Sequence, residues 1–191
     1  MLAPITGPLL DALSLHGATR VGDIGCGGGQ TTRAIAARLP QGAVVHGIDI
    51  SPDVIEAARA ASPGPEGSPE TGDEAGASID FFCADAGSSA PPGPPYDRLT
   101  SRFGVMFFDD PPAAFANIAA WLRPGGRFAF AVWGPLGDNP WMSGLREVVA
   151  EEVEVPAPPP DSPGPFRYAD AAGLREVLEG AGFLDLAVES W

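Results

Sequence analysis

The chain has 191 residues, 45% of them hydrophobic, which is enough for one domain with a sizeable core and too short for two comfortable ones. Eleven basic residues against 25 acidic ones give a net charge of −14, which repels phosphate backbones and anionic membranes. Nucleic acid is therefore not expected as a partner, and a cationic ligand is tolerated. All eleven basic residues are arginine, which excludes a lysine-containing phosphate loop and a lysine Schiff base.

The cysteine count and the hydropathy pattern limit the metal sites, the cellular compartment and the membrane association to be expected. Cys26 and Cys83 give neither a disulfide framework nor a zinc-ligand pattern, so no metal is expected. The N-terminus carries no basic and apolar signal, and no apolar run reaches about 18 residues. We therefore expect a cytoplasmic protein that has no membrane partner.

Apolar periodicity and turn residues predict an alternation of strands and helices. In chain order the sequence predicts a helix at 8–16, a strand at 20–24, a helix at 31–39, a strand at 44–49, a helix at 51–61, a strand at 79–85, a strand running into a loop at 96–108, a helix at 112–122, a turn at 123–126, a strand at 127–133, helices at 141–153 and 168–182, and a closing strand at 183–191.

Two segments interrupt this rhythm. Residues 62–78 are rich in Pro, Gly, Ser and acid and show no apolar period, which predicts a mobile surface loop. Residues 156–165 (PAPPPDSPGP) predict a stiff, extended, proline-rich connector. No internal repeat is present, so residues 1–191 are expected to form a single domain.

The alternation implies right-handed crossovers and an α/β fold. We expect a Rossmann-like, doubly wound, mostly parallel sheet with helices on both faces. Ligands in such folds bind beyond the carboxyl ends of the strands, where the strand order reverses. The glycine-rich stretch follows the first strand of the alternation, so it is expected to lie there.

The stretch VGDIGCGGGQTT (21–32) places Gly25, Gly27 and Gly29 in a G-x-G-x-G pattern. Glycine permits positive φ and lets a ligand touch the main chain, and a loop that opens a helix offers unpaired N–H groups to an anion. The dinucleotide motif G-x-G-x-x-G needs its third glycine at position 30, where this chain has Gln30. An NAD-dependent oxidoreductase is therefore the weaker alternative.

Carboxylates mark the ends of three successive predicted strands. A buried Asp23 is costly unless it is paired, which suggests a cationic partner. Asp49 lies about 20 residues past the glycines, where a carboxylate accepts from a ribose diol. Asp85 is placed to accept from an adenine amino group. Together they describe a site for an adenosine with a cationic tail; a helix cap at Asp49 and a turn role for Asp85 stay open.

Five segments carry a specific resemblance. VGDIGCGGGQTT, GIDIS, FFCADA, YDRLTSRFGVMFF and LRPGGRFAFAVW resemble, in that order, the motif series of class I S-adenosylmethionine-dependent methyltransferases. More narrowly, the chain is similar to small-molecule methyltransferases of the ubiquinone- and menaquinone-biosynthesis type. The resemblance implies the class I methyltransferase fold, S-adenosylmethionine as cofactor, S-adenosylhomocysteine as product and a small molecule as acceptor.

Carried onto matching positions, the resemblance implies a set of cofactor contacts. At the methionine end, the resemblance implies that Asp23 anchors the ammonium directly or through water and that the methionine is cradled by Gly25, Cys26, Gly27 and Gly29. At the adenosine end, it implies that Asp49 binds the ribose hydroxyls, that Ile50 packs on the adenine and that Asp85 and Ala86 bind the adenine edge. Ser101 and Arg102 are implied to border the sulfonium. For Cys26 a loop-filling role, and for Arg102 a surface ion pair, stay open.

The acceptor side is less constrained. Phe103, Trp133, Asn139 and Trp141 are expected to line the acceptor pocket, with plain core packing as the alternative. Methyl transfer needs a general base only where the acceptor loses a proton. Asp109, Asp110, His16 and His46 are the candidates, and none is preferred. A member that binds S-adenosylmethionine without transferring methyl is a second alternative.

The end of the sequence raises a question about the sheet edge. Chains resembling this one close their sheet with a sixth and a seventh strand, and FLDLAVESW (183–191) matches the sixth. We therefore expect a truncated or naturally minimal form that lacks the last strand. The edge at 127–133 is then covered either by 183–191 or by a second copy in a homodimer.

Overall fold

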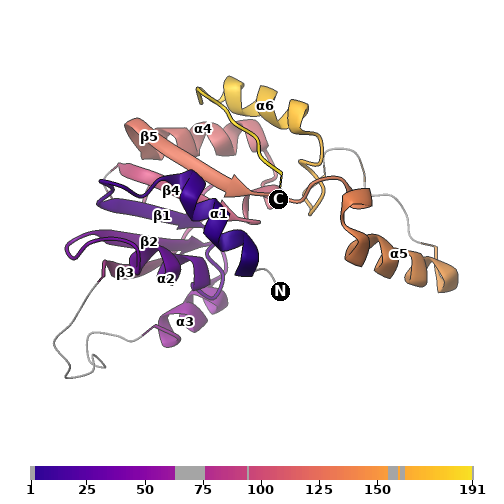
Figure 1. Ribbon diagram of the computed structural model, residues 1–191, viewed down its shortest axis with the longest axis horizontal. Coiled ribbons are helices and arrows are strands. Elements are labelled where there is room, and N and C mark those ends of the chain that lie inside the picture. Colours follow the sequence, from indigo (N-terminus) through magenta and orange to yellow (C-terminus); the bar gives the residue numbers. More distant parts are fainter. Residues whose placement is uncertain (1–2, 63–75, 94, 155–158, 160–161, 191) are drawn as a thin grey trace.

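The computed structural model describes residues 3–62, 76–93, 95–154, 159 and 162–190 (Figure 1). Its five strands form one parallel sheet in the order β3-β2-β1-β4-β5. The strands are β1 (Arg20–Ile24), β2 (Val44–Asp49), β3 (Ser78–Cys83), β4 (Tyr96–Arg102) and β5 (Leu122–Ala131). The helices are α1 (Ala3–Leu13), α2 (Gln30–Ala36), α3 (Pro52–Ala60), α4 (Pro111–Trp121), α5 (Pro140–Glu152) and α6 (Ala171–Gly180), with single 3-10 turns at Val105–Phe107 and Leu136–Asp138.

Helices cover both faces of this sheet, as the alternation predicts. On one face α1 packs on β4 and β5 and α2 packs on β1 and β2, and Leu13, Ile35 and Val45 are fully buried in the core beneath them. On the other face α4 and α6 enclose a second core around Phe115 and Leu99. The predicted doubly wound α/β fold is confirmed. The strand order reverses between β1 and β4, which places the ligand-binding crevice at the carboxyl ends of these two strands.

Local capping fixes where the helices begin. The Ser51 side chain accepts a hydrogen bond from the Val54 amide at 3.4 Å, and Pro52 opens α3 where its missing donor costs nothing. Asp110 caps α4 in the same way, and Asp170 caps α6 by accepting from two amides. The caps of α3 and α4 follow a strand end directly or after a short loop, so they hold the loops at the carboxyl edge of the sheet.

The segment 123–126 is predicted as a turn but lies inside β5. Tyr96 pairs with Leu122 and Arg98 pairs with Arg127, so the four residues 123–126 bulge out opposite a single residue of β4. Gly125 has a φ of 76°, which glycine adopts without strain. The turn chemistry of RPGG therefore produces a bulge within the strand.

The predicted closing strand at 183–191 is wrong, because residues 183–190 form no strand. Phe183 packs on Phe128 with ring centroids 5.9 Å apart, and Arg175 of α6 donates to the Leu186 carbonyl at 3.2 Å. Asp185 has a φ of 55°, which breaks the extended backbone. The segment thus packs on β5 and α6, and within the described residues β5 has a strand partner on its β4 side alone.

Other boundaries differ from the prediction. The first helix, predicted at 8–16, begins at Ala3 and ends at Leu13. Most of the predicted mobile loop at 62–78 and half of the proline-rich connector at 156–165 fall outside the described residues, and residues 163–165 of the connector lie in bends and a turn, so that part is not extended. No helix in the described part of the chain is long and apolar enough to cross a membrane.

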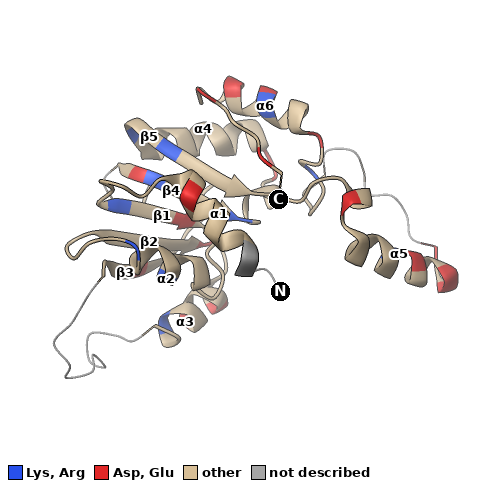
Figure 2. Ribbon diagram, viewed as in Figure 1, with Lys and Arg blue, Asp and Glu red and all other residues tan. Residues whose placement is uncertain are grey.

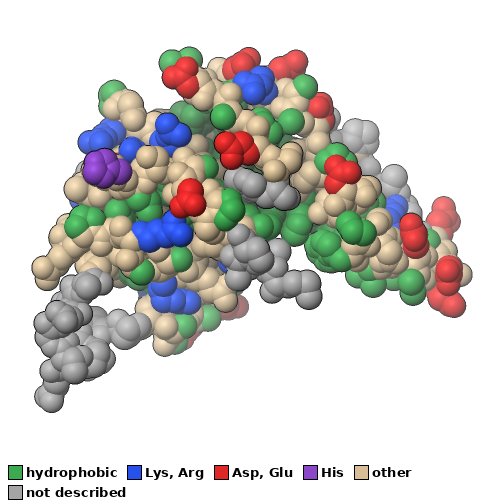
Figure 3. Space-filling view, viewed as in Figure 1, with side chains coloured by type: hydrophobic (Ala, Val, Ile, Leu, Met, Phe, Trp, Pro, Cys, Tyr) green, Lys and Arg blue, Asp and Glu red, His purple; other side chains and the backbone are tan. Residues whose placement is uncertain are grey.

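Helix α5 projects from the body of the domain (Figure 1). It contains no buried residue, and its apolar side chains Trp141, Leu145 and Val148 are more than half exposed. Figure 3 shows hydrophobic side chains on the surface of the projecting helix. The sheet and its five other helices therefore build the core without α5.

Candidate functional site

The glycine loop after β1 is shaped by close backbone approach. Gly25, Gly27 and Gly29 all have positive φ, between 53° and 77°. A Cβ on Gly25 would lie 2.9 Å from the Gly104 Cα, and one on Gly29 would lie 2.8 Å from the ring of Phe81. Both positions therefore require glycine on steric grounds as well as conformational ones.

The amides of this loop are largely used within the protein. Gly25 and Cys26 donate to the Ile48 carbonyl at 2.8 and 3.1 Å, Gly27 donates to Asp49 Oδ2 at 3.0 Å, and Gly29 donates to the Cys26 carbonyl. The expectation of unpaired amides for an anion is wrong for these four. With these four amides engaged, the loop offers fewer donors to a pyrophosphate, which counts against a dinucleotide.

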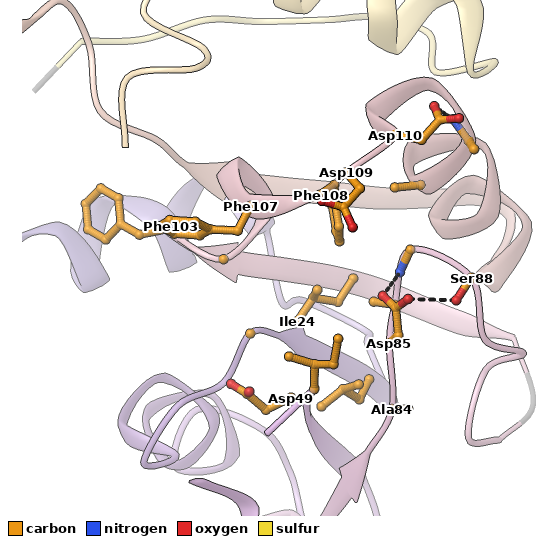
Figure 4. Close-up of a pocket in the computed structure, with 18 of the residues that line it drawn as sticks. Ile24, Asp49, Ala84, Asp85, Ser88, Phe103, Phe107, Phe108, Asp109 and Asp110 are labelled. Atoms are coloured by element: carbon orange, nitrogen blue, oxygen red, sulfur yellow. Dashed lines mark hydrogen bonds between the residues drawn. The ribbon is translucent and has the colours of Figure 1, made fainter. Parts of the chain in front are cut away.

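Two cavities meet at the switch point of the sheet. The larger, of about 570 Å³, extends from the ends of β1, β2 and β3 to the loop after β4 (Figure 4). The smaller, of about 390 Å³, lies over the glycine loop and the start of α2. Gly25 and Arg102 line both cavities, so the two spaces join there. Both volumes are in the range of small-molecule sites.

The larger cavity combines an apolar floor with an acidic rim. Ile24, Ile48, Ile50, Ala84 and Ala86 supply apolar surface, and Ile50 is 67% exposed. The carboxylates among its lining residues are Asp49, Asp85, Asp109 and Asp110. Figure 2 shows that arginines lie at the opposite, amino-terminal ends of β1, β4 and β5. A cavity of this composition favours an apolar ring with hydroxyl or amino donors.

Asp49 ends β2 at the rim of the larger cavity. Its Oδ2 accepts from the Gly27 amide at 3.0 Å and its Oδ1 accepts from the Ser51 amide at 3.1 Å. These bonds hold the glycine loop against α3 and orient the carboxylate. Each oxygen keeps a second lone-pair site, so both the structural role and acceptance from a ligand hydroxyl are chemically available.

Asp85 lies in the turn after β3 (Figure 4). Its Oδ1 accepts from the Gly87 amide at 2.8 Å and its Oδ2 accepts from the Ser88 hydroxyl at 2.7 Å. The turn role is thus present, and the residue also lines the larger cavity next to Ala86. The Ala86 carbonyl accepts from the Asn117 side chain at 2.9 Å, which fixes this loop.

Asp23 is placed differently from the other two strand-end acids. It is 1% exposed and lines neither cavity. Oδ2 accepts from the Thr32 hydroxyl at 2.7 Å, while Oδ1 has no hydrogen-bond partner among the described residues. Burial raises the pKa of Asp23 to about 7, although the Thr32 hydrogen bond and the nearby Arg102 act to lower it. The structure therefore buries this carboxylate outside both cavities, with a hydrogen bond to Thr32 of α2.

Of the other predicted cofactor residues, one lines the smaller cavity and two lie outside both cavities, where they stabilise the surrounding loops. Cys26 lines the smaller cavity, and burial raises the pKa of its thiol, which disfavours a nucleophilic role. Gly29 and Ser101 line neither cavity. Gly29 is the N-cap of α2, and the Ser101 hydroxyl accepts from the Gly104 amide at 3.2 Å.

The predicted acceptor residues are brought together only in part. Phe103 lines the larger cavity and stacks on Trp133 at 4.5 Å, and Trp133 meets Trp141 edge-on at 5.4 Å. Trp133, Asn139 and Trp141 line neither cavity. The Asn139 side chain donates to the Gly134 and Pro135 carbonyls and stabilises the turn before α5. The aromatic cluster thus extends from the cavity wall at Phe103.

The candidate bases separate by position. Asp109 and Asp110 line the larger cavity, and Asp110 also caps α4. His16 lies in the turn before β1, at the amino-terminal end of the sheet, and His46 is buried within β2 with its Nδ1 2.8 Å from the Tyr96 hydroxyl. Burial and the nearby Arg20 lower the pKa of His46. Neither histidine lines a cavity.

Sequence reasoning missed several lining residues. Phe107 and Phe108 line the larger cavity, while Gln30 and Arg33 line the smaller one. The aromatic run in SRFGVMFFDD was the available signal for the first pair. Within the described ranges no group of three or more His, Cys, Asp or Glu side chains is arranged to hold a metal ion.

A family model described as a methyltransferase domain matches residues 22–130, which is more than half of the chain. The chain belongs to this methyltransferase family. It is 36% identical over 132 residues to trans-aconitate 2-methyltransferase of Streptomyces avermitilis, covering 68% of this chain and 44% of that protein. It is 26% identical over 194 residues to nocamycin O-methyltransferase of Saccharothrix syringae, covering 96% and 65%. The chain thus spans less than two thirds of each relative.

Solved structures agree with the fold. Human N-acetylserotonin methyltransferase in complex with S-adenosylmethionine matches with a TM-score of 0.67 at 19% identity, covering 99% of this chain and 49% of that one. The cyclase SpnF matches with a TM-score of 0.63 at 23% identity, covering 94% and 57%. An S-adenosylmethionine-bound amino pentose methyltransferase from Micromonospora echinaspora matches with a TM-score of 0.51 at 26% identity, covering 70% and 50%. The class I methyltransferase fold is confirmed.

Proposed function

We propose that the chain binds S-adenosylmethionine and transfers its methyl group to a small molecule, leaving S-adenosylhomocysteine. The observation that carries this proposal is the junction of the two cavities at Gly25 and Arg102. The adenosine fits the larger, acid-rimmed cavity, and the amino-acid end fits the smaller one over the glycine loop. The sulfonium then lies near the junction, beside Gly25 and open to the Phe103 side of the larger cavity.

The residue roles follow from this placement. Asp49 accepts from the ribose hydroxyls, Ile50 packs on the adenine, and Asp85 with Ala86 faces the adenine edge. Ser101 supports the loop at Gly104 from beneath. The names of the two relatives support methyl transfer to a small molecule, since one is a trans-aconitate methyltransferase and the other an O-methyltransferase.

The chemistry asks little of the protein beyond positioning. Methyl transfer from a sulfonium is an in-line displacement at an activated carbon, so holding the acceptor close and excluding water supplies most of the rate. Phe103, backed by Trp133 and Trp141, forms the wall against which an acceptor packs. Where the acceptor loses a proton, Asp109 is the base that we propose, because it lines the cavity and Asp110 is already engaged as a helix cap.

A non-methylating use of the same fold is the second candidate. SpnF, which shares the fold, is named a cyclase, so the fold by itself does not establish methyl transfer. An NAD-dependent oxidoreductase is disfavoured because four amides of the glycine loop are already paired and Gln30 fills the third motif position.

Calorimetric titration with S-adenosylmethionine, S-adenosylhomocysteine and NAD tests the ligand. We expect binding of the first two and none of NAD; the reverse order would overturn the proposal. Methyl release is then measured over a panel of carboxylic acids, phenols and amines. Binding without methyl release from any acceptor would favour the second candidate.

Asp49→Asn is expected to weaken S-adenosylhomocysteine binding by about 1–2 kcal/mol, because the ribose hydroxyls lose a charged acceptor. The amide keeps one oxygen to accept from Gly27 or Ser51, so the loop is largely preserved. Asp53→Asn, which removes a charge from the exposed start of α3, is the matched control. Equal affinity in Asp49→Asn and this control would refute the ribose assignment.

We further propose that residues 1–191 act as one cytoplasmic domain, and that this domain binds neither nucleic acid nor a membrane. We also propose that two copies of the chain associate along the outer edge of β5. The support for association is that β5 is the last strand of the sheet and that residues 183–190 do not pair with it. Sedimentation across a concentration series is expected to show a dimer. A monomer at all concentrations would contradict this part of the proposal.

A further inference from the structure

Arg102, at the end of β4, is held by side chains from two different helices. Its Nη1 donates to Thr6 Oγ1 of α1 at 3.1 Å, and its Nη2 donates to Gln30 Oε1 at the start of α2 at 3.3 Å. A guanidinium carries five N–H donors, so three remain for a ligand. Because Arg102 lines the smaller cavity as well as the larger one, those donors are available to a ligand group in the smaller cavity, over the glycine loop.

The charges around the cavities make Arg102 distinctive. Among the described residues that line the larger cavity it is the one cation, against four carboxylates. Arg33 also lines the smaller cavity, but its guanidinium donates to the Gly28 carbonyl at 2.9 Å and to the Ser62 hydroxyl at 3.2 Å. Arg33 therefore braces the glycine loop, whereas the two hydrogen bonds of Arg102 go to side chains on helices α1 and α2.

We propose that Arg102 binds the carboxylate at the amino-acid end of S-adenosylmethionine, and that Gln30 and Thr6 are positioning residues that aim it. This inference rests on the proposed function. A guanidinium facing the sulfonium would repel it, and the carboxylate is the one anionic group that the ligand offers. Arginine suits this task because its planar fork matches a carboxylate.

The proposal also explains the glutamine at position 30. A glycine there, as in the dinucleotide motif, has no side chain with which to hold Arg102. A glutamate would accept the same hydrogen bond but would neutralise the guanidinium and oppose a ligand carboxylate. The neutral amide oxygen of Gln30 fixes the guanidinium and leaves its charge for the ligand.

Two ligands that differ in the amino-acid end separate this role from a structural one. S-adenosylhomocysteine carries the carboxylate, and 5′-methylthioadenosine keeps the adenosine and the thioether without it. Arg102→Met is expected to weaken S-adenosylhomocysteine binding roughly 10- to 100-fold, the size of a lost charged hydrogen-bond pair, and to leave 5′-methylthioadenosine binding unchanged. Arg102→Lys should recover part of the loss.

Gln30→Ala and Gln30→Glu test the positioning role without touching the cation. We expect Gln30→Ala to weaken S-adenosylhomocysteine binding by roughly 3- to 10-fold and Gln30→Glu to weaken it more, again with 5′-methylthioadenosine unchanged. Arg38→Met, which removes an exposed arginine that pairs with Asp11, is the control for the loss of one cation.

The outcomes are distinguishable. If the unaltered chain binds neither ligand, the proposed function fails, and this inference fails with it. If the unaltered chain binds both and Arg102→Met binds S-adenosylhomocysteine as well as Arg38→Met does, the carboxylate assignment alone is overturned. An equal loss for both ligands in the Arg102 and Gln30 variants would mean a structural role and would also overturn it.

Discussion

Asp97→Asn is expected to lower the free energy of unfolding by about 2–4 kcal/mol at pH 7, because it breaks a buried charged network. Asp97 is 4% exposed and lies near the start of β4. Its Oδ2 accepts from the Thr19 amide at 2.6 Å, the Thr19 hydroxyl at 3.0 Å and the Arg20 amide at 2.9 Å. Its Oδ1 pairs with Arg123 at 2.9 Å. In Asp97→Asn the side-chain NH₂ group would replace one carboxylate oxygen and would face an N–H or O–H donor of Thr19, Arg20 or Arg123.

The effect should depend on pH in a defined direction. Burial raises the pKa of Asp97, but the hydrogen bonds from Thr19 and Arg20 and the charge of Arg123 outweigh it, so the folded pKa lies below its ordinary value of 3.8. The ionised carboxylate therefore contributes stability above pH 3.8, and this contribution is lost as the pH falls through the lower, folded value. The difference between the unaltered chain and Asp97→Asn should shrink in acid.

Urea denaturation at pH 7, 5 and 3 measures this difference. Asp11→Asn is the matched control, since Asp11 forms an exposed ion pair with Arg38 at 3.0 Å and such pairs contribute about 0–1 kcal/mol. If Asp97→Asn costs no more than Asp11→Asn at pH 7, the network does not stabilise the fold as proposed.

Asp97 also shows where sequence reasoning reached its limit for the fold. The ranges of β1 and β2 are predicted to the residue, because short apolar runs bounded by glycine and by a capped helix are local signals. The hydrogen-bond donors Thr19 and Arg20 lie 78 and 77 positions before Asp97, so no local pattern reveals them. The prediction of a closing strand at 183–191 is wrong because strand formation also depends on residues distant in the sequence. A strand needs a neighbouring strand edge to pair with, and Phe183 instead packs on a face of the sheet against Phe128.

The candidate site was predictable in place more than in detail. The alternation located the crevice, and strand-end acids located its rim at Asp49 and Asp85. Side chains on a strand alternate between faces, so a shift of one residue changes their surroundings. Ile24 lines the larger cavity while Asp23, one residue earlier, lies outside it. Arg102 and Gln30 meet across 72 positions, and that pairing is visible only in three dimensions.

Asp23→Asn is expected to change stability in the opposite sense to Asp97→Asn. Burial, assisted by the charge of Asp49, raises the pKa of Asp23 to about 7, and the Thr32 hydrogen bond and Arg102 only partly oppose this. In the unfolded chain the ordinary value is 3.8. The stability contribution of Asp23 is therefore greatest below pH 3.8 and is lost as the pH rises from 3.8 to 7, because the folded state then has to ionise a buried group.

An asparagine removes that loss without removing the acceptor for Thr32. We expect the free energy of unfolding of Asp23→Asn minus that of the unaltered chain to be about 2–3 kcal/mol larger at pH 8 than at pH 5, so that the variant gains relative stability as the pH rises. Chemical denaturation at the two pH values measures this, with Asp53→Asn as the control for losing one exposed negative charge. A difference that is the same at both pH values would contradict the proposed ionisation.

The same substitution should weaken ligand binding, which gives the carboxylate a function despite its cost to the fold. Asp23 Oδ1 has no partner among the described residues, and the acid lies two residues before the glycine loop over which the ammonium of S-adenosylmethionine is proposed to bind. An ionised Asp23 attracts that ammonium through a poorly screened interior, whereas the amide of asparagine does not. Titration of Asp23→Asn with S-adenosylhomocysteine at pH 8 should therefore show lower affinity in a more stable protein, and an unchanged affinity would leave Asp23 without a role in binding.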